Sequence, residues 1–178
     1  MAPASVAAMT TPKDDRTEPP LAADEHASLE GFLDFHRETL LWKCAELTPD
    51  QLHLRPVPTT NLSLLGLVRH LADVERSWFR RGVAGEDAPP IFYTEQELDL
   101  DIDPPPDADP EADLAVFRAE VEACRAAVRD RALDDSFVSR RGDAISLRWV
   151  YLHMIEEYAR HNGHADLLRQ AIDGATGE

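Results

Sequence analysis

Residues 149–172, WVYLHMIEEYARHNGHADLLRQAI, decide the fold of this chain, because they read as one long helix with a single inward face. At roughly 100° per residue, six positions share a narrow stripe: Val150, Met154, Glu157, His161, Ala165 and Leu168. Apolar residues occupy most of this stripe, so a helical bundle would turn it towards the core. A carboxylate and an imidazole therefore point inward, at Glu157 and His161. Burying a charge without a partner is costly, and a metal ion is the simplest partner for both groups.

The residues around this pair are predicted to have other roles. Glu156 lies roughly 100° further around the helix and four residues before Arg160, an orientation that favours a surface ion pair. His153 and His164 share the polar flank with Arg160, where they can line the mouth of a site without being ligands. A hydrogen bond within the inward pair, with no metal at all, remains the alternative.

A second amphipathic segment supplies a third candidate ligand. Residues 61–79, NLSLLGLVRHLADVERSWF, place His70 between Leu67 and Val74 on the edge of an apolar stripe, so this histidine also faces inward. Two imidazoles and one carboxylate suit zinc with an open fourth position, and equally suit a non-haem iron or nickel centre. The spacing alone does not choose the metal.

The stretches LVRHLADVERSWF (67–79) and HMIEEYARHNGHADLLR (153–169) resemble the DinB-like helical bundle superfamily, in particular its actinobacterial branch of mycothiol-dependent maleylpyruvate isomerase and mycothiol S-transferases. The resemblance covers about residues 26–174. It implies a metal centre with His70 from the second helix and the Glu-x-x-x-His pair Glu157 and His161 from the fourth. The carboxylate in this pair departs from the commonest, all-histidine site and favours the mycothiol branch over the bacillithiol branch.

Four long helices are expected, at about 27–47, 61–81, 110–132 and 147–172. Asn61 or Ser63 is the expected cap of the second helix, and Gly174 closes the last. No alternation of period two is long enough to predict a sheet. The expected fold is an all-α, four-helix up-down bundle with one long crossover loop, of the DinB-like kind.

Gly163 conflicts with the helix that surrounds it, because glycine inside a helix costs about 1 kcal/mol relative to alanine. It suggests a close helix approach or room for a ligand beside the metal, and a helix break is the plain alternative. The resemblance supports a continuous helix.

The net charge of −16 is concentrated in one segment. Eleven acidic residues and no basic one lie between Glu86 and Asp113, which leaves −5 for the rest of the chain. This segment is either a solvated linker or a flap over the site, with Ile91, Phe92 and Tyr93 packed and the acids outside. An acidic surface repels phosphates, so no nucleic-acid partner is expected.

Residues 1–24 are predicted to form a disordered tail, and residues 25–178 to form the metal-binding bundle. The sequence contains no stretch of 18 apolar residues, so no membrane span is expected. Cys44 and Cys124 are expected to be small core residues in a reducing cytoplasm, and His36 to be a core residue or a neighbour of the ligands. The chain is expected to be a monomer or a homodimer.

These expectations favour a divalent-metal-dependent thiol S-transferase, or a thiol-assisted isomerase, with mycothiol as co-substrate and a small electrophile as substrate. Zinc is the favoured ion, with nickel, iron or manganese as alternatives, and His153, Arg160 and His164 are candidates for orienting the thiol or the substrate. One alternative is a hydrolase that uses metal-bound water, with Tyr158 or His153 as the acid. Another is a non-enzymatic bundle protein of the stress response with a structural polar cluster.

Overall fold

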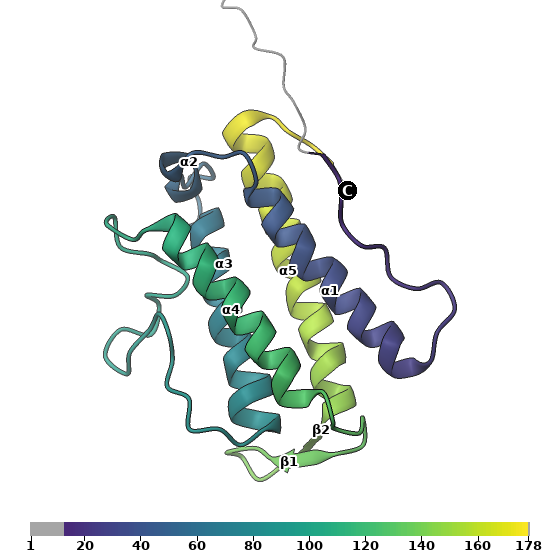
Figure 1. Ribbon diagram of the computed structural model, residues 1–178. Helices are drawn as coiled ribbons and strands as arrows, with labels where there is room; N and C mark the ends of the chain where they lie inside the picture. The colour runs from purple at the N-terminus through teal and green to yellow at the C-terminus, as the bar shows by residue number, and fades with distance from the viewer. Residues whose placement is uncertain (1–12, 178) are drawn as a thin grey trace, which may run out of the picture.

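Four long helices lie side by side in the computed structural model, which describes residues 13–177 (Figure 1). In chain order the elements are α1 Glu25–Cys44, α2 Pro49–His53, α3 Leu64–Glu75, η1 Arg76–Val83, α4 Pro110–Val128, β1 Ser136–Val138, β2 Ala144–Ser146 and α5 Leu147–Asp173. Helices α1 and α5 run in one direction, and α3 and α4 run in the other (Figure 1). The long loop that joins η1 to α4 returns along the outside (Figure 1). The predicted all-α bundle with one long crossover is therefore confirmed.

The ends of the long helices are capped by side chains that the sequence places there. Ser63 accepts a hydrogen bond from the backbone N–H of Gly66 at 3.0 Å, which confirms it as the cap of α3. Ser146 caps α5 in the same way, through the N–H of Trp149 at 3.2 Å. Gly174 ends α5 with a φ of 79°, the left-handed conformation that favours glycine.

The core fills the space between the pairs α1–α5 and α3–α4. The apolar members of the predicted stripe of α5 are buried in this core together with leucines of α1 and α3, whereas Glu157 and His161 are partly exposed. The largest fully buried side chains are Tyr158, Phe79, Phe117, Leu33, Leu40, Leu64, Leu65, Leu67, Leu71, Leu147, Met154 and Leu168.

Two local features differ from the predicted helices. The second helix does continue to Val83, but from Arg76 it is a π-helix, in which each turn takes in one more residue than an α-helix does. The segment before α5 forms a small antiparallel hairpin, with Phe137 paired to Ile145, where no sheet was expected. Its strands are three residues each, too short for an alternation to stand out in the sequence.

The segment before α1 contacts the bundle. Residues 13–24 contain no helix or strand, but the guanidinium of Arg16 lies 4.7 Å from the centre of the Phe35 ring and 4.5 Å from that of Trp42. It also donates a hydrogen bond to Thr39 Oγ1 at 2.9 Å. The described part of the predicted disordered tail is thus held on α1, and residues 1–12 of that tail lie outside the described residues.

The acidic crossover loop, residues 84–109, is docked on α3 and has no helix or strand of its own. Both carboxylate oxygens of Asp73 accept backbone N–H groups from the loop, from Ile91 at 2.7 Å and Phe92 at 2.9 Å. A Cβ atom on Gly66 would overlap the carbonyl of Ile102, so the loop backbone lies directly against the helix. These contacts favour the packed flap over the solvated linker.

Among the described residues, no helix is both long and apolar enough to cross a membrane.

Candidate metal centre

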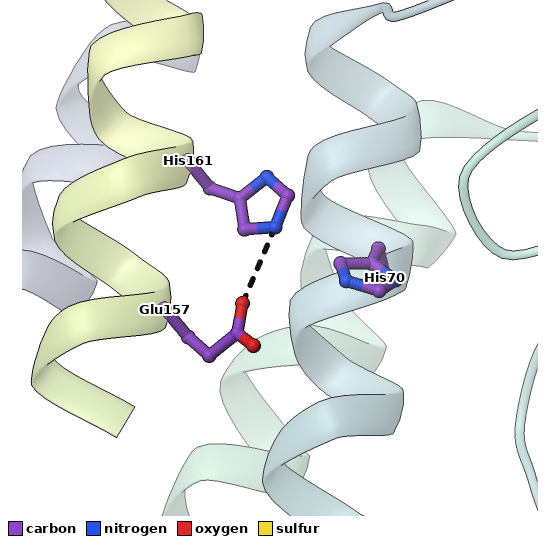
Figure 2. Close-up of side chains that lie close together, drawn as sticks. All are labelled: His70, Glu157 and His161. Atoms are coloured by element: carbon purple, nitrogen blue, oxygen red, sulfur yellow. Dashed lines mark ion pairs between the residues drawn. The ribbon is translucent and has the colours of Figure 1, made fainter. Parts of the chain in front are cut away.

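His70, Glu157 and His161 meet between α3 and α5, as Figure 2 shows. One potential ligand atom from each residue lies within 4.8 Å of those of the other two. His161 Nε2 is 3.5 Å from a carboxylate oxygen of Glu157, and the rings of His70 and His161 are 5.0 Å apart between centroids. The structure thus brings together the three residues that the sequence singled out, from two helices far apart in the chain.

The three side chains lie at the rim of the core. Their exposed fractions are 27% for His70, 25% for Glu157 and 12% for His161. Met154 and Ala165, on the same stripe of α5, are fully buried behind them. The cluster is therefore backed by apolar packing and open to solvent on one side, as a site with a vacant coordination position requires.

Asp101 of the acidic loop fixes the orientation of His70. Its carboxylate accepts a hydrogen bond from His70 Nδ1 at 2.8 Å, and its other oxygen accepts the backbone N–H of Ile102 at 2.8 Å. With the proton on Nδ1, the lone pair of His70 is on Nε2, the ring nitrogen that remains for a ligand. A carboxylate behind a metal-binding histidine is the usual arrangement in metalloproteins.

The environment keeps His161 neutral. Burial, with smaller contributions from His70 and His164, lowers the pKa of His161 to about 4. A neutral imidazole at pH 7 has a free lone pair, so protons do not compete with a cation there. The Nδ1 atoms of His164 and His161 are 3.5 Å apart.

His153 also lies beside the cluster, whereas Arg160 does not. His153 Nε2 is 3.7 Å from the second carboxylate oxygen of Glu157. Arg160 is exposed and pairs with the exposed Glu156, with Nε 3.1 Å from Oε1. The predicted surface pair is confirmed. Of the three candidates for orienting a thiol or substrate, the structure brings His153 and His164 to the cluster and turns Arg160 away.

A second group of potential ligands overlaps the first, because His153, Glu156 and Glu157 also have ligand atoms within 4.8 Å of one another. All three are on α5, and Glu156 is already paired with Arg160 on the surface. The cluster that includes His70 is the better site, because it is less exposed and is supported by Asp101.

Tyr158 is not available as an acid at this site. It is fully buried, and its hydroxyl donates a hydrogen bond to Glu75 Oε1 at 2.9 Å. Burial and the carboxylate of Glu75 raise the pKa of Tyr158 well above its ordinary value. Arg37 donates to both oxygens of Glu75 at 2.7 Å, so these three residues form a polar contact inside the core. The expectation that Tyr158 serves a hydrolase as acid was wrong.

Both cysteines are core residues, as predicted. Cys44 and Cys124 are buried and unpaired. Burial raises the pKa of the Cys44 thiol to about 12, and burial with nearby Glu75 raises that of Cys124 as well. Neither residue supplies a reactive thiolate at neutral pH.

Asn162 and Gly163 follow His161 directly on α5. The side-chain amide of Asn162 donates to the backbone carbonyl of His36 at 3.0 Å, which places His36 behind the site, in contact with α5. Burial lowers the pKa of His36. Helix α5 is continuous through Gly163, and a Cβ there would meet no described atom within 4 Å. The suggested helix break and close helix approach were both wrong, and no contact explains this glycine.

The chain was compared with protein families, with solved structures and with curated proteins. The profile of a family described as Mycothiol-S-transferase matches residues 28–174. A crystal structure of a conserved protein from Enterococcus faecalis has a similar fold, with a TM-score of 0.61 and 17% sequence identity over 86% of this chain and 100% of that chain. At this identity the likeness concerns the fold alone. No curated protein matches the chain.

Proposed function

Because this chain belongs to the mycothiol-S-transferase family, we propose that it is a divalent-metal-dependent enzyme that joins the sulfur of mycothiol to a small electrophile. The observation that carries the proposal is the convergence of His70, Glu157 and His161 on one point between two helices. The family match supports the thiol, and the donor set supports the metal. Zinc is the first choice for two histidines and a carboxylate, and nickel, iron and manganese remain alternatives.

Each of the three residues has a property that suits a ligand of a divalent cation. Glu157 supplies the negative charge, His161 is neutral at pH 7, and His70 has its lone pair on Nε2 because Asp101 accepts the proton of Nδ1. A divalent cation held there would keep a small thiol in its thiolate form at neutral pH.

The thiol has to come from outside the chain. Cys44 and Cys124 are buried and have raised pKa values, so neither reaches the open side of the cluster. His153 lies beside Glu157 and His164 beside His161, so these two histidines are the proposed groups that donate hydrogen bonds to a bound thiol or electrophile. In the reaction the thiol gives up its proton, and its sulfur forms a bond to the electrophilic carbon. In a substitution the leaving group departs with the electron pair of the broken bond and takes up the proton, and in an addition to a conjugated double bond the electron pair of that double bond takes up the proton at the neighbouring carbon.

Metal analysis of purified protein tests the first half of this proposal, and the adjacent glutamates provide a matched pair of variants. Glu157→Ala is expected to weaken binding of Zn²⁺ about tenfold or more, because it removes the anionic ligand. Glu156→Ala removes only an exposed ion pair worth about 0.3–0.5 kcal/mol and is expected to leave metal affinity unchanged. No binding of zinc, nickel, iron or manganese by the wild-type protein would contradict the metal centre.

Thiol consumption with a model electrophile tests the second half. Mycothiol is expected to react in an enzyme- and metal-dependent way, with bacillithiol and glutathione much poorer. Product that forms at the same rate without any thiol would replace the transferase with a hydrolase that uses the same three residues. Metal-free protein with full activity would contradict both.

A further inference from the structure

An open cavity of about 840 Å³ lies at the start of α5, and none of the three candidate metal ligands lines it. It lies between the ends of α5 and η1 and the β1–β2 hairpin, which is at the bottom of the view in Figure 1. Two aromatic residues, one from η1 and one from α5, and the hairpin loop form its walls. The residues that line it include Trp78, Trp149, Ser139, Arg140, Arg141 and Asp143.

The aromatic wall of this cavity leads to the metal centre. The ring of Trp149 stacks on His153 at 4.8 Å with an interplanar angle of 17°, and Trp78 meets both rings, at 5.2 Å and 4.8 Å. His153 in turn lies 3.7 Å from Glu157. The indole of Trp149 and the imidazole of His153 therefore form a continuous row of contacts from the cavity to Glu157. Trp149 is eight residues before Glu157 on α5, which is roughly 12 Å along the helix axis.

The exposure of this wall indicates a binding face. Trp149 is 45% exposed, although indole is among the side chains that gain most from burial. A ligand with a flat apolar part would cover the ring and recover that burial. Exposed aromatic surface beside a polar rim is typical of binding sites.

The charge at the rim of the cavity is positive, on a chain whose net charge is −16. Most arginines of the described chain are in ion pairs, including Arg76 and Arg80 on η1 itself. Arg140 and Arg141 form no ion pair with any residue among 13–177, and neither does Arg81, which lines an adjoining cavity that shares Trp78 and Arg140.

Acidic residues offset this charge only in part. Asp143 is the acidic residue among those that line the first cavity, and its carboxylate is in no ion pair with the two arginines there. Glu86 and Asp87 line the adjoining cavity, where Glu86 is held by Arg80 at 2.7 Å. Arginines without an anionic partner in an aromatic cavity favour a ligand that carries its own anion.

We propose that this cavity binds the electrophilic substrate, and that the substrate is a planar, apolar molecule with a carboxylate. The planar part lies on Trp149 and Trp78, and the carboxylate is received by Arg140 and Arg141. His153, which does not line the cavity itself, connects this aromatic wall to Glu157 of the cluster. The assignment of the ligand as the electrophile rests on the proposed function, whereas binding of an aromatic acid in the cavity does not.

Isothermal titration calorimetry with 2-naphthoate, and with the neutral 2-naphthylmethanol, tests the proposal on the whole protein. Naphthoate is expected to bind about tenfold more tightly than the alcohol, because a charge-assisted hydrogen bond to an arginine lowers the dissociation constant by at least about that factor. Arg140→Ala and Arg141→Ala are expected to remove most of this preference and leave the affinity for the alcohol unchanged. Trp149→Ala is expected to weaken the binding of both ligands, because it removes the ring on which they lie. Arg118→Ala, an exposed arginine of α4 outside both cavities, is the matched control and is expected to change neither.

Equal affinity for the acid and the alcohol would overturn the proposal, as would an acid preference that survives in both arginine variants. Tighter binding of a neutral polyol such as inositol than of naphthoate would overturn it in favour of a cavity for a polyhydroxylated ligand. The titration is repeated on Glu157→Ala protein and after metal removal, where naphthoate binding is expected to persist. If the wild-type protein binds naphthoate but binds no metal or has no transferase activity, the proposed function is contradicted and the cavity proposal stands. If it binds metal and transfers the thiol but does not bind naphthoate, the cavity proposal alone is contradicted. Finally, naphthoate is expected to inhibit mycothiol consumption competitively with a model electrophile.

Discussion

Asp101 is the residue through which the acidic loop reaches the candidate metal centre. Replacing Asp101 with alanine is expected to weaken Zn²⁺ binding about 10- to 100-fold, because His70 loses the carboxylate that fixes its tautomer and ring orientation. Competition with a chromophoric chelator measures this change. Asp99→Ala, an exposed acid of the same loop, is the control and is expected to retain wild-type affinity. Equal affinities in the two variants would mean that Asp101 acts only as part of the loop.

The sequence predicted the three candidate ligands but not Asp101, for a physical reason. Helical periodicity fixes which side chains of a helix face the core, so His70, Glu157 and His161 were found from spacing alone. Asp101 stands in a loop without periodicity, among other acids that are exposed, and the loop was expected to keep its acids outside. Its role depends on a tertiary contact, the docking of the loop on α3. Tyr158 shows the same limit, because its partner Glu75 is on another helix.

At the scale of the helices, two glycines are expected to respond to alanine in opposite ways. Gly163 lies inside α5, where a Cβ would meet no described atom within 4 Å, so Gly163→Ala is expected to stabilise the protein by about 0.5–1 kcal/mol. Gly66 in α3 is covered by the carbonyl of Ile102, so Gly66→Ala is expected to destabilise the protein and to displace the loop. Urea unfolding of both variants at one pH measures the two effects. A loss of stability in Gly163→Ala would indicate that position 163 needs glycine for a reason that the packing does not show.

The elements themselves were predicted to different degrees. The long helices follow from apolar periodicity and from caps such as Ser63 and Gly174, and α5 begins at the predicted residue. The π-helical turn at Arg76–Val83 and the β1–β2 hairpin did not follow from the pattern. A π turn depends on how the helix packs at its end, and two strands of three residues each depend on pairing, which composition does not reveal.

At the scale of the whole molecule, one buried ion pair ties together three of the four long helices. Arg37 of α1 and Tyr158 of α5 both donate to Glu75 at the end of α3. Arg37→Ala leaves the carboxylate of Glu75 buried without its cation and is expected to lower the free energy of unfolding by about 3–5 kcal/mol. Arg160→Ala breaks only an exposed pair, and the expected loss is below about 0.5 kcal/mol. Chemical denaturation compares the two, and similar losses would mean that the core tolerates the unpaired carboxylate.

Docking of the loop and binding of an ion at the candidate centre are expected to strengthen each other. If the contact between Asp101 and His70 strengthens ion binding by some factor, then ion binding must stabilise the docked loop by the same factor, because the two equilibria share one thermodynamic cycle. The backbone amides of Ile91, Phe92 and Ile102, which are hydrogen-bonded to carboxylates in the docked state, would then exchange with deuterium more slowly as the ion is added. The opening of a surface loop would thus report the occupancy of a centre formed by two helices.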